Sequence, residues 1–271
     1  SGASVEFVGA DDGPELVVKT GPVGPDAPWG NVADEVARLE WAAGVGAPVP
    51  RVVKFTDHGD GTATLVTERL GGFEATRKEA RARPEGLVDL FGKALRVWHD
   101  NLPVADCPFR SDWTTRLDVA RTRIDAGKAT AADLDPAYQR IDFDVLLASL
   151  DRPNPDDPDD LVVIHGDPSL PNMIIGGGGL SGWVDIGRLG VGSRWCDLMI
   201  GATTVASNLG PLLVPALFEA YGVDIADTPD ELFDRHVAVN IRPTFAACRA
   251  AVRQFRKQGG GGHIINVSSI A

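Results

Sequence analysis

Three side chains between residues 160 and 190 could bind a metal ion or accept a proton. Asp167 follows the apolar run VVI and a His-Gly pair, Asn172 is five residues later, and Asp185 follows a further apolar stretch. Two carboxylates and one amide oxygen suit a hard cation such as Mg²⁺. Phosphoryl transfer needs such a cation to neutralise the phosphates, and it needs a carboxylate to orient the attacking hydroxyl. The segment therefore predicts a phosphoryl-transfer site.

Each of these residues is also a common turn former, and a turn is the simpler explanation for any one alone. Their order favours a site, because H-G-D-x4-N and a downstream strand-Asp-x-Gly occur together. Lys19 lies near the end of a β-rich run and Glu35 lies on the next helix, so the two can form an ion pair that fixes the ammonium. Two ordinary surface charges are the alternative, because exposed pairs are common and weak.

The elements that must position these residues change in type along the chain. The first 67 residues are rich in short strands around one helix at 31–43, with a hairpin turn at 57–62. From residue 70 apolar residues recur at three- and four-residue steps, which is typical of amphipathic helices. The elements expected there are helices at 85–99, 113–126, 138–150, 194–209 and 212–221, with two short strands within 160–190.

The composition limits the classes of partner. The chain has 271 residues, of which 44% are hydrophobic and 24% charged, as in a globular protein. Its net charge of −12 argues against nucleic acid or an anionic membrane, and it is compatible with a cationic small molecule or with solubility alone. No apolar run approaches the roughly 20 residues of a membrane span, and the first residues do not form a secretory signal. Three widely spaced cysteines favour a reducing cytoplasm.

HGDPSLPN and VDIGRLG together resemble the catalytic and metal-binding segments of the aminoglycoside 3′-phosphotransferases. VVKT is similar to the lysine strand of that family, DEVARLEWA to its glutamate helix and TERLGG to its interlobe hinge. The resemblance spans about residues 1–224. It implies an α/β (α+β) fold of the protein-kinase type, with a small β-rich N-terminal lobe at 1–67 and a larger helical C-terminal lobe at 68–227.

The resemblance also implies a role for each residue of the central motifs. Asp167 would accept the proton of the substrate hydroxyl, and Asn172 and Asp185 would hold Mg²⁺. Lys19 would contact the α- and β-phosphates of ATP or GTP, with Glu35 paired to it.

Further contacts follow from the same resemblance. The loop at 1–4 would lie over the phosphates, and the hinge would offer backbone groups to the base. An acidic segment falls where the family binds drug ammonium groups, although a solvated helix start is the alternative. Arg188 would lie near the substrate hydroxyls, or would pair with an acid such as Asp185, and His165 would orient the loop. The residues concerned are Ser1, Gly2, Ala3 and Ser4 for the phosphates, Thr67 and Arg69 for the base, and Asp133, Asp135 and Arg188 for the aminoglycoside.

The last segment, 228–271, resembles a fragment of a short-chain dehydrogenase/reductase. It is similar to a central helix of that family and to the strand that ends at the catalytic serine, here Ser269. The Tyr-x-x-x-Lys that should follow is absent, and a serine without its base cannot carry out the reaction. We interpret the segment as an appended helix–strand tail without dehydrogenase activity. Its HIINV strand could join a second protomer and form a homo-oligomer.

The favoured function is a kinase that transfers phosphate from ATP or GTP to a hydroxyl of an aminoglycoside. Two alternatives remain at this point. The chain begins at the phosphate loop, and its tail replaces an acidic segment that binds the drug in the family, so the protein could bind a nucleotide without turnover. It could also serve as an oligomer-forming protein through the tail. In the kinase-like fold, Lys19 and Asp185 must lie within about 10 Å of each other, because both must reach one triphosphate.

Overall fold

The computed structural model describes residues 3–9, 15–24, 31–127 and 158–223, together with Val145 and Ala148. Several expectations lie outside these ranges. They concern Ser1, Gly2, Asp133, Asp135, nearly all of the helix at 138–150 and the whole tail at 228–271.

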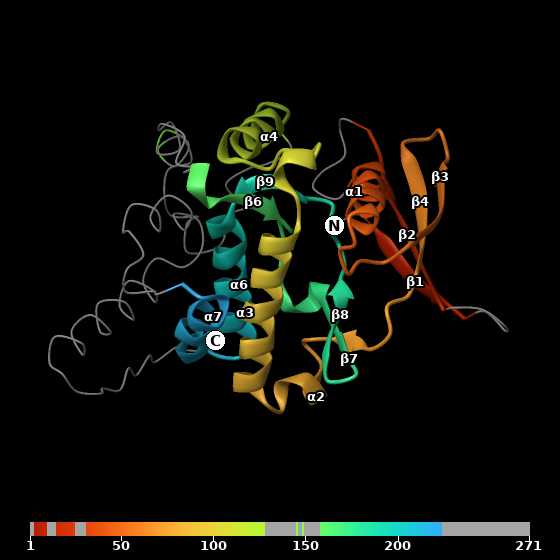
Figure 1. Cartoon of the computed structure of the whole chain (residues 1–271). Helices are drawn as coiled ribbons and strands as arrows, with labels where there is room; N and C mark the ends of the chain where they lie inside the picture. The colour runs from red at the N-terminus through yellow and green to blue at the C-terminus, as the bar shows by residue number, and fades with distance from the viewer. Residues whose placement is uncertain are drawn as a thin grey trace, which may run out of the picture.

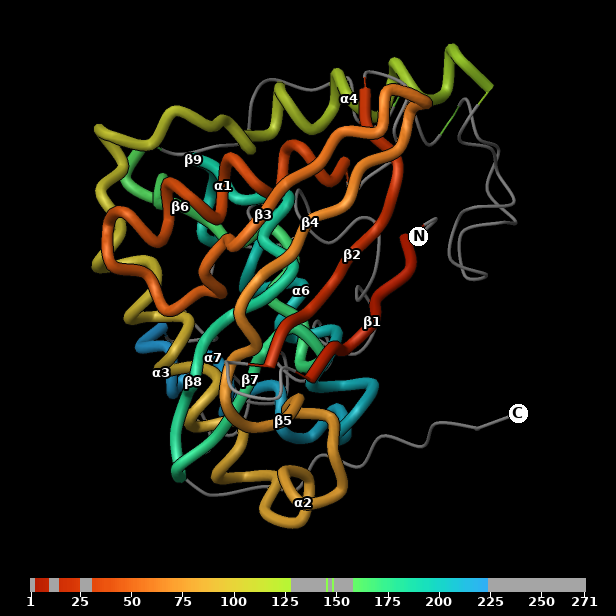
Figure 2. Tube along the Cα trace, turned by 90° about the vertical axis from the view of Figure 1, so that its right-hand side faces the viewer, coloured from red at the N-terminus to blue at the C-terminus, as the bar shows by residue number. Residues whose placement is uncertain are grey.

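An antiparallel sheet and one helix form the N-terminal part (Figures 1 and 2). The strands are β1 (Ser4–Val8), β2 (Leu16–Pro22), β3 (Val52–Asp57) and β4 (Thr62–Glu68), in the order β1-β2-β4-β3. Helix α1 (Val32–Gly44) lies between β2 and β3 in the sequence. The expected strands, helix and hairpin turn of this part are confirmed. Strand β4 ends next to the expected lobe boundary.

Local sequence explains why this part folds as it does. Strand β4 alternates between buried and half-buried residues, so Leu65 and Thr67 face inward, as expected for a sheet with one covered face. Helix α1 begins at Asn31, whose side chain accepts a hydrogen bond from the Ala33 amide at 3.0 Å. Its buried face consists of Val32, Glu35, Val36, Leu39 and Ala42.

Helices dominate the second part of the described chain. They are α2 (Lys78–Arg81), α3 (Pro84–Asn101), α4 (Trp113–Asp125), α6 (Arg194–Asn208) and α7 (Val214–Tyr221). Figure 1 shows α3, α6 and α7 side by side on the side of the molecule away from the four-stranded sheet. The helices expected at 85–99, 113–126, 194–209 and 212–221 are confirmed, with ends that differ by at most a few residues.

Close contact between α3 and α7 depends on a small residue. Gly92 of α3 faces α7 so closely that a Cβ atom there would lie 2.7 Å from Ala220 Cβ and 2.8 Å from the Leu217 carbonyl oxygen. Phe91 and Phe218, which are fully buried, contribute to the core of this part. Replacing Gly92 would therefore push the two helices apart.

Two small sheets carry the loops of interest. One consists of β5 (Phe73–Glu74), β7 (Met173–Gly176) and β8 (Gly179–Trp183), and the other of β6 (Leu161–Ile164) and β9 (Gly190–Ser193). Strand β6 leads directly into the His-Gly-Asp segment. Strand β8 leads into the segment of the second aspartate, which then enters β9. Short 3-10 turns lie at Val104–Asp106, Pro158–Asp160, Leu170–Asn172 and Pro211–Leu213.

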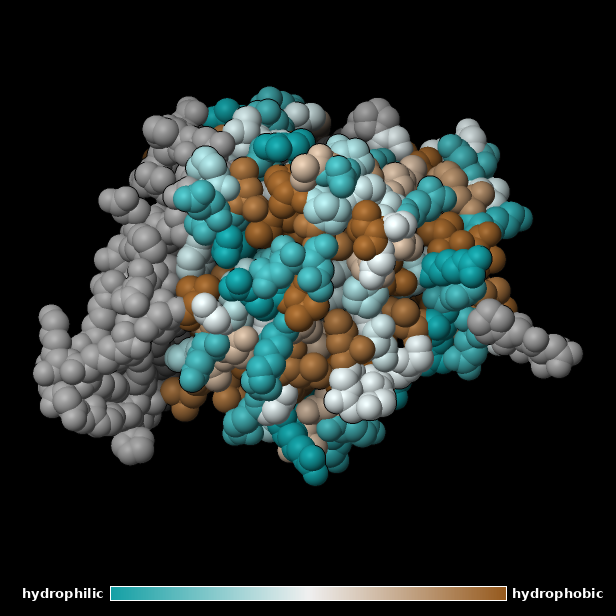
Figure 3. Space-filling model, in the orientation of Figure 1, coloured by the Kyte–Doolittle hydropathy of each residue, from teal (hydrophilic) through white to brown (hydrophobic). Residues whose placement is uncertain are grey.

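The core extends through both parts and centres on aromatic residues. Trp183, which is fully buried, lies 5.7 Å from the ring of Phe91 and 5.3 Å from the ring of His165, measured between ring centroids. On the face drawn in Figure 3, hydrophilic and hydrophobic residues are interspersed. Within the described ranges, no helix has the length and apolar character required to cross a membrane.

Candidate active site

A cleft of about 320 Å³ opens between the four-stranded sheet and the β7–β8 hairpin. Phe7 and Leu65 of the sheet and Ile174 of β7 are among its apolar walls. Three charged residues of the sequence motifs, Lys19, Glu35 and Asp185, line the same cleft, and we call them the charge cluster. The cleft thus combines apolar walls with a compact group of charges.

The charge cluster is held together by two short ion pairs. Lys19 Nζ lies 2.6 Å from Glu35 Oε2 and 2.8 Å from Asp185 Oδ1. The second distance is far inside the roughly 10 Å that the kinase-like fold requires, so that expectation is confirmed. The side chain of Glu35 is 6% exposed, that of Lys19 17% and that of Asp185 49%. Asp185 is therefore the member that solvent or a ligand reaches most easily.

The surroundings shift the pKa values of all three groups. Burial alone would lower the pKa of Lys19, but the charges of Glu35 and Asp185 outweigh it and raise the pKa. Burial raises the pKa of Glu35 even though Lys19 opposes this change. Burial would also raise the pKa of Asp185, but the Lys19 ammonium outweighs it and holds the pKa below its ordinary value. At neutral pH the cluster therefore keeps a cationic lysine and an anionic Asp185.

Asp185 has an unusual backbone. Its φ angle is 60°, and it is the one residue other than glycine with a positive φ among those described. This left-handed conformation is uncommon for non-glycine residues and concentrates at functional sites. The Val184 amide donates to the Asn172 carbonyl oxygen at 2.9 Å, which joins the two motifs next to Asp185. The backbone therefore brings Asn172 and Asp185 together.

The segment 165–172, which we call the catalytic loop, orients Asn172. Asn172 Nδ2 donates to the Asp167 carbonyl oxygen at 3.0 Å, so the amide oxygen of Asn172 is turned away from this contact. Arg188 Nη1 lies 3.6 Å from Asp167 Oδ2, so Arg188 pairs with Asp167 within the described structure. The catalytic carboxylate expected from the sequence thus has a basic neighbour.

His165 lies beneath the catalytic loop and is fully buried. Its Nδ1 atom accepts a hydrogen bond from the Asp167 amide at 3.2 Å. Burial lowers the pKa of His165, although nearby carboxylates oppose this change, so the ring is neutral at physiological pH. A buried neutral ring that binds the Asp167 backbone orients the loop, which is the role that the sequence predicts for it.

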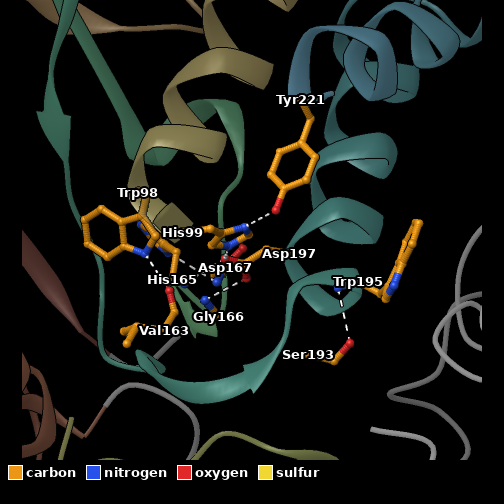
Figure 4. A network of polar contacts seen from close by, with 10 residues as sticks. All are labelled: Trp98, His99, Val163, His165, Gly166, Asp167, Ser193, Trp195, Asp197 and Tyr221. Carbon is orange, nitrogen blue, oxygen red and sulfur yellow. Dashed lines mark hydrogen bonds and ion pairs between the residues drawn. The ribbon is translucent and has the colours of Figure 1, made fainter. Parts of the chain in front are cut away.

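A second set of polar side chains supports the same loop (Figure 4). It consists of His99, Asp197 and Tyr221, and we call it the buried network. Asp197 of α6 accepts hydrogen bonds from the His165 amide at 2.6 Å and the Gly166 amide at 2.9 Å. Its Oδ2 atom also lies 3.1 Å from His99 Nε2, and His99 Nδ1 lies 2.7 Å from the Tyr221 hydroxyl. The buried network therefore ties α3, α6 and α7 to the residues just before Asp167.

Sequence reasoning missed the buried network as a set of functional residues. The segment SRWCDLMIGA resembles the family, but nothing in it indicates that Asp197 binds the catalytic loop. The available signal was an acidic residue in the first turn of α6, after the N-cap Ser193. Phe7 of β1, which lines the cleft and is 67% exposed, was also missed as a cleft residue.

The residues expected to contact the nucleotide base and phosphates lie at the start of β1 and around the end of β4. Ser4 is the first residue of β1 rather than part of a loop, and neither Ala3 nor Ser4 lines the cleft. Thr67 lines the cleft from β4. The Arg69 amide donates to the Glu15 carbonyl oxygen at 2.8 Å, so this amide is already bonded. The Arg69 side chain also binds the Glu15 carboxylate and lies over the ring of Phe7, with 5.4 Å from Cζ to the centroid.

The donors present fit a magnesium ion that is shared with phosphates. Asp185 offers a partly exposed carboxylate, and Asn172 offers an amide oxygen whose amide nitrogen is already bonded. Within the described ranges, no three His, Cys, Asp or Glu side chains group as a metal site by themselves. Mg²⁺ is commonly bound through one or two protein ligands together with substrate phosphates. Asn172 and Asp185 are the residues that would hold it here.

The fold and the charge cluster together define a two-lobed, kinase-like phosphotransferase. The chain belongs to the phosphotransferase enzyme family, whose sequence profile matches residues 1–233. It is 35% identical over 230 residues to an aminoglycoside 3′-phosphotransferase of Salmonella typhimurium, with 84% of this chain and 82% of that protein covered. It is 34% identical over 215 residues to one of Streptomyces fradiae, with 79% of each chain covered. The predicted family and enzyme class are confirmed.

Solved structures support the same fold. A crystal structure of an aminoglycoside 3′-phosphotransferase of type VIII superposes with a TM-score of 0.67 at 26% identity, covering 93% of each chain. An aminoglycoside phosphotransferase from Streptomyces rimosus, solved with ADP and streptomycin, has a TM-score of 0.65 at 23% identity. It covers 87% of this chain and 90% of that one, and it supports the fold alone. The predicted kinase-like fold class is confirmed.

The C-terminal part matches a second family. The profile of the short chain dehydrogenases matches residues 204–271, which confirms the resemblance noted for 228–271 and extends it toward the N-terminus. The described portion of this match, 204–223, comprises the end of α6 and α7. Both helices pack within the helical part, where Tyr221 joins the buried network.

Proposed function

We propose that this chain transfers the γ-phosphate of ATP or GTP to a hydroxyl group of an aminoglycoside antibiotic, with Mg²⁺ as cofactor, and thereby confers resistance. The observation that carries the proposal is the position of Lys19, which binds both Glu35 and Asp185 in a cleft that Asn172 also lines. Membership of the phosphotransferase enzyme family supports it, as do relatives named as aminoglycoside 3′-phosphotransferases.

The charge cluster suits the binding of a triphosphate. The buried Glu35 keeps the Lys19 ammonium in place, so Lys19 is ready to contact phosphate oxygens. Asp185 can release Lys19 because its carboxylate is about half exposed. Mg²⁺ held by Asn172 and Asp185 would supply the charge that neutralises the phosphates during transfer. The apolar walls of the cleft offer a surface for the base.

Asp167 is proposed to accept the proton of the attacking hydroxyl. Its side chain is 30% exposed, and its backbone is held by His165 and Asn172, so the carboxylate has a defined position. Because Arg188 neutralises part of its charge, we propose that Arg188 turns to the substrate when the acceptor binds. A positioned carboxylate of this kind contributes about 10²- to 10⁴-fold to the rate of a proton transfer.

The acceptor and the compartment follow from charge and from the donor. A net charge of −12 favours a polycationic acceptor, and Asp133 and Asp135, which lie outside the described residues, remain the proposed contacts to its ammonium groups. We expect the protein to act in the cytoplasm, because that compartment supplies the nucleoside triphosphate.

The test is a transfer assay with the full chain. The protein is incubated with Mg²⁺, kanamycin and ATP or GTP labelled at the γ-phosphate, and the label in the drug is counted. Asp167→Asn should lower kcat by on the order of 10²-fold or more while nucleotide affinity stays the same, because the proton acceptor is lost. Asp89→Asn, an exposed change on α3, is the matched control and should keep full activity.

The transfer assay, together with the shift in melting temperature on adding ATP or GTP, decides between the functions considered. Nucleotide binding without transfer to any of a panel of aminoglycosides would support a pseudo-enzyme and contradict the proposal. Transfer that survives in Asp167→Asn would show that another group accepts the proton. The absence of any nucleotide-dependent shift in melting temperature would contradict a kinase altogether.

A further inference from the structure

Helix α1 contacts the metal-binding segment at two places. Glu35 and Arg38 are three residues apart, so they lie on the same side of the helix. Glu35 reaches Asp185 through Lys19, as described above. Arg38 Nε donates a hydrogen bond to the Leu189 carbonyl oxygen at 2.8 Å. Residues 185–189, which we call the metal loop, are therefore tied to α1 near both ends.

The guanidinium group of Arg38 is fixed in orientation. Its side chain is 16% exposed, and Nη1 donates to the Asp34 carbonyl oxygen at 3.0 Å. Its Cζ atom lies 4.7 Å from the centroid of the Phe109 ring, which is a cation–π distance. Trp41 holds this ring from the side, in an edge-on arrangement at 6.3 Å. Arg38 is thus held by its own helix and by an aromatic ring of the helical part.

Phe109 is itself part of the structure that receives the metal loop. The Val191 amide donates to the Phe109 carbonyl oxygen at 2.8 Å, and Val191 lies in β9, directly after the metal loop. The Trp41 indole also donates to the Asp106 carbonyl oxygen at 3.2 Å. The face of α1 that carries Arg38 therefore packs on the same segment that fixes the end of the metal loop.

The metal loop needs such support because its conformation is strained. Asp185 has a φ of 60°. Within residues 185–189 there is one backbone hydrogen bond, from the Leu189 amide to the Ile186 carbonyl oxygen at 2.9 Å. Strained backbone persists only where the surroundings hold it. The end of the loop at Leu189 is held by Arg38, while the Asp185 carboxylate at its start is held by Lys19, which a phosphate would displace.

We propose that Arg38 is a positioning residue that keeps Asp185 in the conformation needed to hold Mg²⁺ when a nucleotide draws Lys19 away. The inference rests on the proposed function, since it assigns a task at the same nucleotide and metal site. Residues that orient a metal ligand without touching the metal commonly change metal affinity by roughly 10- to 100-fold when they are replaced. Arg38 would act in this way through the backbone of Leu189.

The proposal requires arginine rather than a positive charge alone. The contact to Leu189 uses Nε, while Nη1 binds Asp34 and the planar group stacks on Phe109. A lysine ammonium has no such fork and cannot make these three contacts together. Arg38→Lys should therefore weaken ATP binding in the presence of Mg²⁺ nearly as much as Arg38→Gln does. If only the positive charge at this position mattered, Arg38→Lys would bind ATP as the wild type does.

The experiment measures nucleotide binding without any acceptor. The Kd of ATP is determined by calorimetry with and without Mg²⁺ for the full wild-type chain and for Arg38→Gln, Arg38→Lys and Arg81→Gln. In both Arg38 variants the Kd with Mg²⁺ should rise about 10- to 100-fold, while the Kd without Mg²⁺ changes little. Arg81→Gln, an exposed change on α2, should match the wild type. Phe109→Leu removes the stacking partner and should give a smaller shift of the same kind.

The outcomes separate the inference from the function on which it rests. If Mg²⁺ changes the Kd of ATP by the same factor in the Arg38 variants as in the wild type, the inference is overturned and the proposed function stays intact. An equal loss of affinity with and without Mg²⁺ would also overturn it, because Arg38 would then support the lobe in general. If Arg38→Gln does not fold, Arg38→Lys and Phe109→Leu decide the question. If the wild type itself binds no ATP or GTP, the proposed function is wrong and the inference falls with it.

Discussion

The charge cluster in the cleft and the buried network beneath the catalytic loop support the same active site by different means. Lys19 and Asp185 are open to solvent in part and hold each other by charge. The side chains of His99 and Asp197 are fully buried. Asp197 accepts hydrogen bonds from two backbone amides, and His99 links it to Tyr221. The charge cluster can exchange partners when a phosphate arrives. The buried network cannot, because each lost hydrogen bond would leave a buried polar group without a partner.

This difference separates binding from stability. Changes at Asp185, the half-exposed member of the charge cluster, should alter nucleotide binding and turnover while the melting temperature stays nearly constant. Changes in the buried network should lower the melting temperature first and affect turnover through the position of the catalytic loop. This distinction is wrong if both kinds of change alter the melting temperature and nucleotide binding to the same extent.

The largest effect is expected for Asp185→Asn. The variant loses the charge that attracts Mg²⁺, so the Kd of ATP with Mg²⁺ should rise on the order of 10²-fold, since metal–phosphate charge stabilisation is worth several kcal/mol. Thermal stability should fall only slightly, because the lost ion pair with Lys19 is half exposed and asparagine adopts a positive φ more readily than most residues. Calorimetry and thermal unfolding of the same samples check both statements. A large loss of stability would mean that Asp185 belongs with the buried network.

The charge cluster could be predicted from sequence because each of its residues lies in a short motif. Lys19 lies in VVKT, Glu35 in the first helical turn within DEVARLEWA, and Asp185 in VDIGRLG. Periodicity placed each motif on the correct strand, helix or loop, and the resemblance of the motifs to the phosphotransferase family implied their kinase-like arrangement. The φ of Asp185 and its direct contact to Lys19 could not be predicted, because they depend on how the two lobes meet.

The buried network could not be predicted for a related reason. Its side chains come from α3, α6 and α7, which lie far apart in the sequence, and each looks like an ordinary amphipathic-helix residue. A histidine on an apolar helix face gives no sign of its partner until the helices are packed. The hinge shows the same limit, since the Arg69 amide is taken up by Glu15, which lies on another part of the chain.

The next largest effect is expected for Asp197→Asn. Asp197 accepts hydrogen bonds from two loop amides and contacts His99, and an amide group would turn one NH₂ toward these donors. The free energy of unfolding should fall by about 3 kcal/mol or more, because buried donors lose a charged acceptor. Urea unfolding checks the value. If stability is unchanged and ATP binding is weaker, Asp197 acts like the charge cluster, and the proposed difference between the two sets of residues is wrong.

A smaller effect is expected for Tyr221→Phe. The change keeps the ring and removes the hydroxyl that lies 2.7 Å from His99 Nδ1, so the free energy of unfolding should fall by about 1 to 2 kcal/mol. Because His99 links Tyr221 to Asp197, the double variant with Asp197→Asn should lose less than the sum of the two single variants. Purely additive losses, measured by urea unfolding, would show that the network does not act as a unit.

The smallest effect concerns pH and His165. Burial lowers the pKa of His165 in the folded protein, whereas the unfolded chain should have a value near 6.5. Below that value the unfolded state takes up a proton that the folded state does not, so stability is lost as pH falls through about 6.5 and is constant above it. The loss between pH 7.5 and 6 should be below about 1 kcal/mol for this one group. Unfolding of wild type and His165→Asn is compared across this range, since all other titrating groups are common to both. The variant should have the flatter profile, and equal slopes would mean that His165 does not remain neutral when buried.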